Sequence, residues 1–145
     1  MHGSNYTGLE FLTALKNGEV PASPMAHTIP MKLIEVSIGK ATYEVRPGPE
    51  HMNIQGGVHG GFYATVLDTV TGSAAHSLLD ADVNYGTIDL NVKMIRPMQV
   101  NMIYYAQAEL INAGRNIITT EGKIIDREGK VYAFASATLM VIHRK

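Results

Sequence analysis

The second half of the chain alternates between apolar and polar positions with the period of two that is typical of β-strands. The alternation predicts strands over residues 87–95, 100–112, 116–126 and 131–143. It is most regular in the last segment, where six alternate positions are apolar: Val131, Ala133, Ala135, Ala137, Leu139 and Val141. Turns at Gly114 and Gly129 separate the last three segments, so the pattern predicts antiparallel strands joined by hairpins.

The first half of the chain predicts a hairpin and two helices. Leucines spaced three apart in residues 7–17 indicate a short amphipathic helix, and the prolines of residues 18–30 make that stretch a connector. Residues 31–46 alternate on both sides of a glycine and predict a hairpin. Residues 60–79 predict one long helix whose side chains are small and apolar on nearly every side, which is typical of a buried helix.

Together these elements predict one α+β domain in which about six antiparallel strands wrap around a single long helix. Its 145 residues are close to the usual size of one domain. We assign residues 1–30 to the N-terminal helix and connector, and residues 31–145 to the sheet and central helix. One helix cannot cover both faces of the sheet, so the outer face and the edges require another subunit or polar side chains.

Composition excludes several classes of function. A net charge of -1, with no basic run longer than His143-Arg144-Lys145, argues against a general nucleic-acid surface. The absence of cysteine excludes disulfides, thiolate metal sites and a cysteine nucleophile, and the six histidines form no zinc pattern. No stretch has the roughly 18 apolar residues of a membrane span. The polar start, residues 1–5, lacks a signal core, so we expect a cytoplasmic protein.

The segment with candidate chemistry precedes the long helix. Residues 53–61 contain four glycines within six positions, which allow close approach of another group to the backbone. Gly60 and Gly61 lie where the helix is predicted to begin, and the first amide N–H groups of a helix have no partner within it and carry partial positive charge. An oxygen that becomes negative during a reaction would be stabilised there.

Asp68 lies in the apolar part of the same helix. An aspartate in a helix is usually a surface charge, but Val66, Leu67 and Val70 flank this one, and burial without a function would be costly. Eight residues separate Asp68 from Gly60, which is a rise of roughly 12 Å along a helix. If both act on one carbon atom, they must come from different chains related by a two-fold axis, so the protein is expected to be an oligomer.

The spacing Asn53, His59-Gly60-Gly61 and Asp68, followed by Thr87 and by Arg96-Pro97, resembles the PaaI-type branch of the hotdog-fold acyl-CoA thioesterases. The resemblance covers about residues 31–143. It implies hydrolysis of an acyl-CoA to a carboxylic acid and free CoA, with no metal and no cofactor other than the CoA of the substrate. It also implies a homodimer or a dimer of dimers, in line with the expected oligomer.

The resemblance also implies a role for each residue. The Gly60 amide would polarise the thioester carbonyl, with Gly61 beside it in the substrate-binding region. Asp68 of the partner subunit would attack the carbonyl or activate a water. Asn53 would orient the carbonyl or the water, and His59 would hold the loop and line the catalytic site. The remaining substrate-contacting candidates are Thr87, near the carboxylate, and Arg96, Arg115 and Lys123, near the CoA phosphates.

Each of these residues also has a purely structural interpretation. Asn53 would cap a turn, His59 would be a loop residue, and Thr87 would be an ordinary strand residue. The three cations would be solvated surface charges. Two other functions stay open: a hotdog hydratase or dehydratase that uses His59 with Asp68, and a domain that binds acyl-CoA without turnover. Product analysis separates them, because only a thioesterase releases free thiol.

Overall fold

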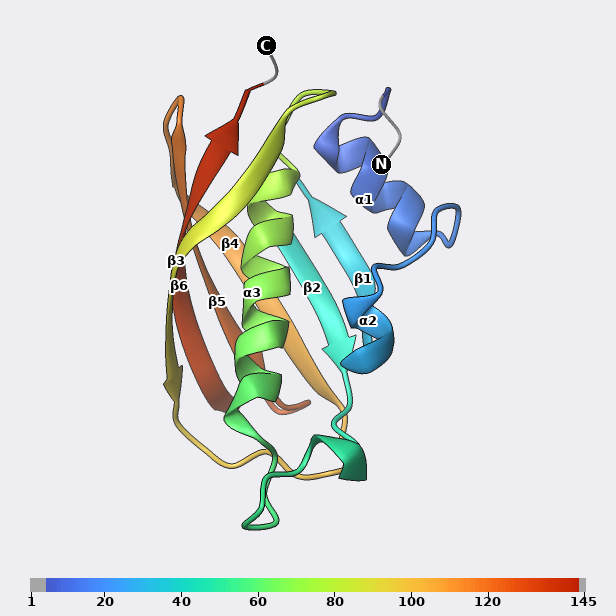
Figure 1. The fold of residues 1–145 in the computed structure, drawn as a ribbon, viewed down its shortest axis with the longest axis vertical. Coiled ribbons are helices and arrows are strands. Elements are labelled where there is room, and N and C mark those ends of the chain that lie inside the picture. Colours follow the sequence, from blue (N-terminus) through green and yellow to red (C-terminus); the bar gives the residue numbers. More distant parts are fainter. Residues whose placement is uncertain (1–4, 144–145) are drawn as a thin grey trace.

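The computed structural model describes residues 5–143, so residues 1–4 and the last two residues of the basic C-terminus lie outside the described part. The chain folds into one curved antiparallel sheet that wraps around the long helix α3, Gly60–His76 (Figure 1). This is the expected hotdog arrangement. None of the helices within residues 5–143 is long and apolar enough to cross a membrane.

The sheet has six strands in the order β1-β2-β4-β5-β6-β3, and all neighbours are antiparallel. The strands are β1 Met31–Ser37, β2 Lys40–Val45, β3 Asn84–Met94, β4 Tyr104–Ala113, β5 Ile117–Ile125 and β6 Val131–Ile142. The hairpin β1-β2 and the meander β4-β5-β6 are local, as predicted. Strand β3 precedes the meander in the chain but pairs with its last strand, which makes β3 an edge of the sheet.

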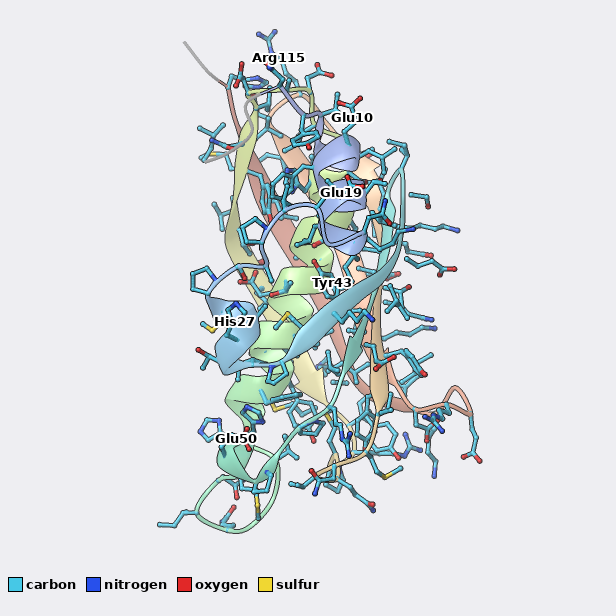
Figure 2. All side chains as sticks on the ribbon, turned by 90° about the vertical axis from the view of Figure 1, so that its right-hand side faces the viewer. Glu10, Glu19, His27, Tyr43, Glu50 and Arg115 are labelled. Carbon is cyan, nitrogen blue, oxygen red and sulfur yellow. The ribbon has the colours of Figure 1, made fainter. Side chains whose placement is uncertain are left out.

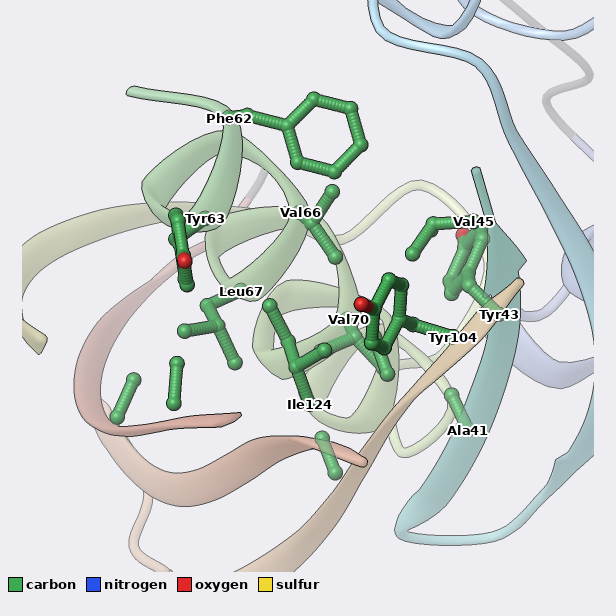
Figure 3. Close-up of a cluster of buried hydrophobic side chains, with 14 of the residues drawn as sticks. Ala41, Tyr43, Val45, Phe62, Tyr63, Val66, Leu67, Val70, Tyr104 and Ile124 are labelled. Carbon is green, nitrogen blue, oxygen red and sulfur yellow. The ribbon is translucent and has the colours of Figure 1, made fainter. Parts of the chain in front are cut away.

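Helix α3 packs into the concave face of the sheet through large side chains. Leu67, Val66 and Val70 are fully buried and meet Ile124 of β5 and Tyr104 of β4 (Figure 3). The facing positions on β6 are alanines, and β5 contributes a glycine at residue 122. A Cβ atom there would lie 3.1 Å from the Thr71 Cγ2 atom and 3.1 Å from the Gln107 carbonyl oxygen. Small residues on the sheet therefore set how closely the helix approaches.

Two further helices pack against β1 (Figure 1). Helix α1, Gly8–Lys16, begins with a capping box between Thr7 and Glu10 and packs on β1 and α3, with Leu12 inside the core (Figure 1). The predicted helix 7–17 is therefore confirmed. Helix α2, Met25–Thr28, is a single turn inside the predicted connector. It was not predicted, since four residues are too few for a periodic pattern.

The predicted long helix extends three residues too far. Helix α3 ends at His76 because the Ser77 hydroxyl donates to the Ala74 carbonyl oxygen over 2.7 Å and accepts the Gly39 N–H over 2.7 Å. The predicted helix extended to residue 79 because the contact between Ser77 and the β1-β2 turn forms only in the folded chain and is not visible in the sequence.

The predicted strand boundaries also need correction. Strand β3 begins at Asn84 rather than residue 87. Strand β4 begins at Tyr104 rather than residue 100, because Asn101 adopts a positive φ and donates its N–H to the Pro47 carbonyl oxygen. The even alternation predicted in β3 is interrupted by a bulge between Thr87 and Asp89. Ile88, predicted on the apolar face, is 57% exposed as a result.

Candidate active site

The start of α3 presents an amide without a partner. His59 is the N-cap residue, and its Nδ1 atom accepts the Gly61 N–H over 2.7 Å, while its carbonyl oxygen accepts the Phe62 N–H over 2.9 Å. The Gly60 N–H has no acceptor among residues 5–143. It therefore remains available at the positive end of the helix dipole.

His51 holds the loop before α3 in place. Its Nδ1 atom accepts the Gly48 N–H over 2.9 Å, and its Nε2 atom lies 3.0 Å from the Thr28 carbonyl oxygen, which accepts the Nε2 proton in this tautomer. The carbonyl oxygen of His51 in turn accepts the His59 N–H over 2.8 Å. Sequence reasoning missed this residue, because one buried histidine in a loop has no pattern of its own.

Asn53 closes the glycine-rich loop. Its Oδ1 atom accepts the N–H groups of Gln55 at 2.9 Å and Gly57 at 3.0 Å, and its own N–H donates to the Gly57 carbonyl oxygen over 2.7 Å. This is the turn-capping interpretation, observed directly. The Nδ2 amide group donates to none of the residues that the structure describes, so a donor is left over on this side chain.

Asp68 and Thr87 come together across the gap between α3 and β3. The Thr87 hydroxyl donates to the Asp68 Oδ1 atom over 2.9 Å. The sequence suggested that the apolar helix buries Asp68, whereas the side chain is exposed in the single chain. The helix has one open side, and Asp68 lies on it.

One protomer cannot bring Asp68 and its own Gly60 amide to the same atom. Helix α3 is continuous from Gly60 to His76, so the eight residues between them are a rise of roughly 12 Å. The structure therefore keeps the separation on which the two-chain arrangement depends.

The three candidate cations do not gather in one place. Arg96 follows the end of β3, and its guanidinium donates to the Val131 carbonyl oxygen over 2.7 Å. Arg115 lies in the β4-β5 turn, at the end of the molecule opposite Glu50 (Figure 2), and its carbonyl oxygen accepts from His143. Lys123 belongs to β5, where it lies in register with Gln107 and Phe134. Within one protomer, only Arg96 lies near the start of α3, since Tyr63 of the first turn donates to its carbonyl oxygen over 2.9 Å.

An open hollow of about 530 Å³ adjoins the start of α3. His59, Gly61 and Thr65 form its α3 side, and Glu50 is the acidic group at its rim. The rest of the lining combines four apolar residues with two polar ones: Met25, Ile29, Met52 and Phe62, and Thr28 and His51. Among residues 5–143, no three His, Cys, Asp or Glu side chains are grouped so as to hold a metal ion.

Two titratable groups with shifted pKa values lie near the C-terminal half of α3: His76 on the helix and Tyr85 on β3. Burial lowers the pKa of His76, so its imidazole is neutral near pH 7. Burial, followed by the proximity of Tyr43 and of the Asp68 charge, raises the pKa of Tyr85 to about 12, so its hydroxyl keeps its proton. Both rings lie close together, with centroids 5.4 Å apart.

Comparison with known proteins gives consistent results. Residues 55–133, more than half of the chain, match the sequence profile of the thioesterase superfamily. A candidate esterase of Halobacterium salinarum is 38% identical over 73 residues, which is 49% of this chain and 47% of that protein. The chain thus spans about half the length of this relative.

Solved structures extend the likeness to most of the chain. A candidate thioesterase of Ralstonia eutropha, described as related to phenylacetic acid degradation, has a TM-score of 0.82 and 27% identity, and the match covers 90% of this chain and 98% of that one. The phenylacetic acid degradation protein PaaI of Thermus thermophilus has a TM-score of 0.75 at 19% identity, over 81% of this chain and 98% of its own. At 19% identity, the similarity to the Thermus thermophilus protein shows only that the two chains share a fold.

Proposed function

The chain belongs to the thioesterase superfamily and has the hotdog fold of its PaaI-type members, and from this premise we propose that it hydrolyses acyl-CoA thioesters to a carboxylic acid and free CoA. The observation that carries the proposal is the pair of groups on α3. The Gly60 amide lacks a partner among the described residues, and the Asp68 carboxylate is held by Thr87 on the open side of the helix.

In the proposed reaction, the thioester carbonyl oxygen accepts a hydrogen bond from the Gly60 N–H of one subunit. The partner subunit's Asp68 either takes a proton from a water that attacks the carbonyl carbon, or attacks that carbon itself to form an anhydride that water then opens. In both routes a C–O bond forms, the C–S bond breaks, and the CoA thiolate leaves and takes up a proton. The Gly60 amide stabilises the oxyanion, the role that gives such donors their effect on rate.

The free edge of the sheet supports the two-subunit arrangement. Strand β3 is 11 residues long and is an edge of the six-stranded sheet, and exposed edges of that length pair readily with another chain. β3 also carries Thr87, which holds Asp68. A second copy, turned about a two-fold axis beside this edge, would bring the start of its α3 toward Asp68.

The surrounding residues have supporting roles in this proposal. His59 fixes the first turn of α3 through the Gly61 amide, and so fixes the direction of the Gly60 N–H. Asn53 holds the loop with its Oδ1 atom and would offer its unused Nδ2 donor to the carbonyl or to the water. Gly61, Thr87, Arg96 and Arg115 would contact the substrate, the two arginines through the CoA phosphates.

The direct test is thiol release from a panel of aromatic and aliphatic acyl-CoAs by the wild type and by Asp68→Asn. We expect the variant to lose a factor of at least about 100 in kcat, since a positioned proton acceptor contributes on that scale. Asp80→Asn, an exposed aspartate beyond the end of α3, is the matched control and should keep wild-type activity. Near-full activity of Asp68→Asn would refute the assignment.

The same panel separates the rival functions. A changed double bond in the acyl group, without thiol release, would identify a hydratase or dehydratase. Tight acyl-CoA binding with neither change would identify a binding domain.

A further inference from the structure

The hydroxyl of Tyr85 lies against the Asp68 side of helix α3. Tyr85 belongs to β3, and its hydroxyl is 2.9 Å from the point where a Cβ atom on Gly72 would be. Gly72 follows Asp68 by four residues, so the two positions lie above one another on the same side of the helix, about 6 Å apart. The Tyr85 hydroxyl is therefore one helical turn from the proposed catalytic carboxylate.

The geometry of strand β3 independently places Tyr85 on the same side as Thr87, the partner of Asp68. Tyr85 and Thr87 are two residues apart and so point to one side of the strand. Their register partners on β6, Val141 and Leu139, are both buried on the inner face of the sheet. Since Thr87 reaches Asp68 with its hydroxyl, Tyr85 projects to the same inner side, one step along the strand.

The hydroxyl of Tyr85 has no hydrogen-bond partner within residues 5–143. Its aromatic ring lies beside the His76 ring, but this is a contact between two rings and not a hydrogen bond. Part of the residue is exposed, but the hydroxyl end is buried, and it stays protonated with a pKa of about 12. A buried hydroxyl without an acceptor destabilises the folded protein unless a bound group accepts its hydrogen bond.

Gly72 makes room for this hydroxyl. Glycine inside a helix is less favourable than alanine, and Gly72 lies in the middle of α3. A methyl group there would come within 2.9 Å of the Tyr85 hydroxyl oxygen and 3.1 Å of the Cε2 atom of the ring. The glycine therefore permits the position of the phenol beside Asp68.

We propose that Tyr85 is a specificity-determining residue of the Asp68 site, whose hydroxyl forms a hydrogen bond with an oxygen atom carried by the acyl group. This rests on the proposed thioesterase function. With the carbonyl carbon at Asp68 and the phenol one turn away, the matching oxygen is on the third carbon of the acyl chain. The substrates it favours are 3-hydroxyacyl-CoAs over acyl-CoAs of equal length without the hydroxyl, because the latter leave the buried phenol unpaired.

The test compares kcat/KM for 3-hydroxybutyryl-CoA and butyryl-CoA in the wild type and in Tyr85→Phe. The two substrates differ by one oxygen atom, and the substitution removes one oxygen atom from the protein. We expect the wild type to favour the hydroxylated substrate by roughly tenfold or more, and the ratio to fall close to one in Tyr85→Phe. Butyryl-CoA turnover should be kept or increased, because the variant has no unpaired hydroxyl.

Two further variants sharpen the comparison. Gly72→Ala introduces the methyl group that displaces the hydroxyl, and should reduce the same ratio without removing the phenol. Tyr105→Phe removes a hydroxyl from β4, from a residue paired with Glu44 and Ile125, and should leave the ratio at its wild-type value.

Each other outcome is decisive. An unchanged ratio in Tyr85→Phe, or a wild type that hydrolyses other acyl-CoAs but does not prefer the 3-hydroxy substrate, overturns the role of Tyr85 and leaves the thioesterase proposal standing. Equal loss of both activities together with dissociation of the oligomer in Tyr85→Phe overturns it too, since the hydroxyl would then serve the subunit interface. Absence of thiol release from every acyl-CoA in the wild type ends both proposals.

Discussion

At the scale of single residues, the bond between Thr87 and Asp68 matters most for the proposed chemistry. Asp68 is exposed, and an exposed aspartate samples several rotamers unless a partner fixes one. The Thr87 hydroxyl supplies that partner at 2.9 Å from Oδ1. The bond therefore gives the carboxylate one orientation on the open side of α3.

Thr87→Val keeps the shape of the side chain and removes the hydroxyl. We expect kcat/KM for thioester hydrolysis to fall about tenfold, the scale of one hydrogen bond to a charged group. Thr87→Ser, which restores the donor, should recover most of the rate. Steady-state kinetics of both variants checks this, and wild-type kinetics in Thr87→Val would show that the bond does not orient the catalytic group.

Residue types and spacing predicted part of this site. The spacing from Asn53 to Asp68 identified the loop and the helix start, and Thr87 was expected near the carboxylate, where the structure places it. Asn53 carried two interpretations, and only the structure shows that its Oδ1 atom caps the loop. Tyr85 could not be singled out, because a tyrosine in a strand is ordinary and its unpaired hydroxyl exists only in the folded chain.

At the scale of elements, a row of three aromatic rings, tilted relative to one another, links α1 to α3 and β3. The His76 ring lies between Phe11 of α1, with centroids 5.7 Å apart, and Tyr85 of β3, with centroids 5.4 Å apart. A second contact adds to it, since the Gly8 N–H donates to the Leu79 carbonyl oxygen over 2.9 Å. The neutral His76 ring thus contributes to the docking of the N-terminal helix, beside the buried Leu12.

Burial lowers the pKa of His76 in the folded protein below the unfolded value of about 6.5. Above that value the ring is neutral in both states, so its titration gives the free energy of unfolding no pH dependence. As the pH falls from about 6.5 toward the folded pKa, the unfolded chain binds the proton first, so the free energy of unfolding decreases. Denaturant unfolding between pH 7 and pH 5 should show this loss, and His76→Phe, which keeps a ring, should reduce it. An equal pH dependence in both proteins would contradict the account.

Periodicity predicted most elements, and local chemistry decided their ends. The four C-terminal strands and the first hairpin follow from alternation, helix α1 follows from leucine spacing, and helix α3 follows from its small, apolar composition. The end of α3 at His76 depends on a bond between Ser77 and the distant β1-β2 turn. The bulge beside Ile88 depends on pairing between β3 and β6. Neither interaction is visible in a local pattern.

At the scale of the whole molecule, the sheet leaves β3 unpaired on one side. The sequence predicted one helix and about six strands, but the strand order requires knowing that β3 pairs with β6, two hairpins farther along the chain. That order places the Thr87-bearing strand at the edge, beside Asp68. The outer edge of β3 and the start of α3 are therefore the surfaces through which a second copy would complete the site.

The central claim is that each active site combines the Gly60 amide of one subunit with Asp68 of the other, and a mixture of two inactive variants tests it. Asp68→Asn removes the carboxylate. Gly60→Pro removes the amide N–H at a position that accepts proline, because it is the first residue of α3 and His59 before it is extended, with ψ 139°. A Cβ atom at this position would meet only the flexible end of the Met94 side chain, 3.1 Å away.

The measurement is thiol release by each variant alone and by the two variants unfolded and refolded together. We predict that each alone is nearly inactive and that the mixture recovers about a quarter of wild-type activity, since half of the dimers are mixed and each has one intact site of two. A mixture that stays as inactive as its components, while forming mixed dimers, would contradict the account.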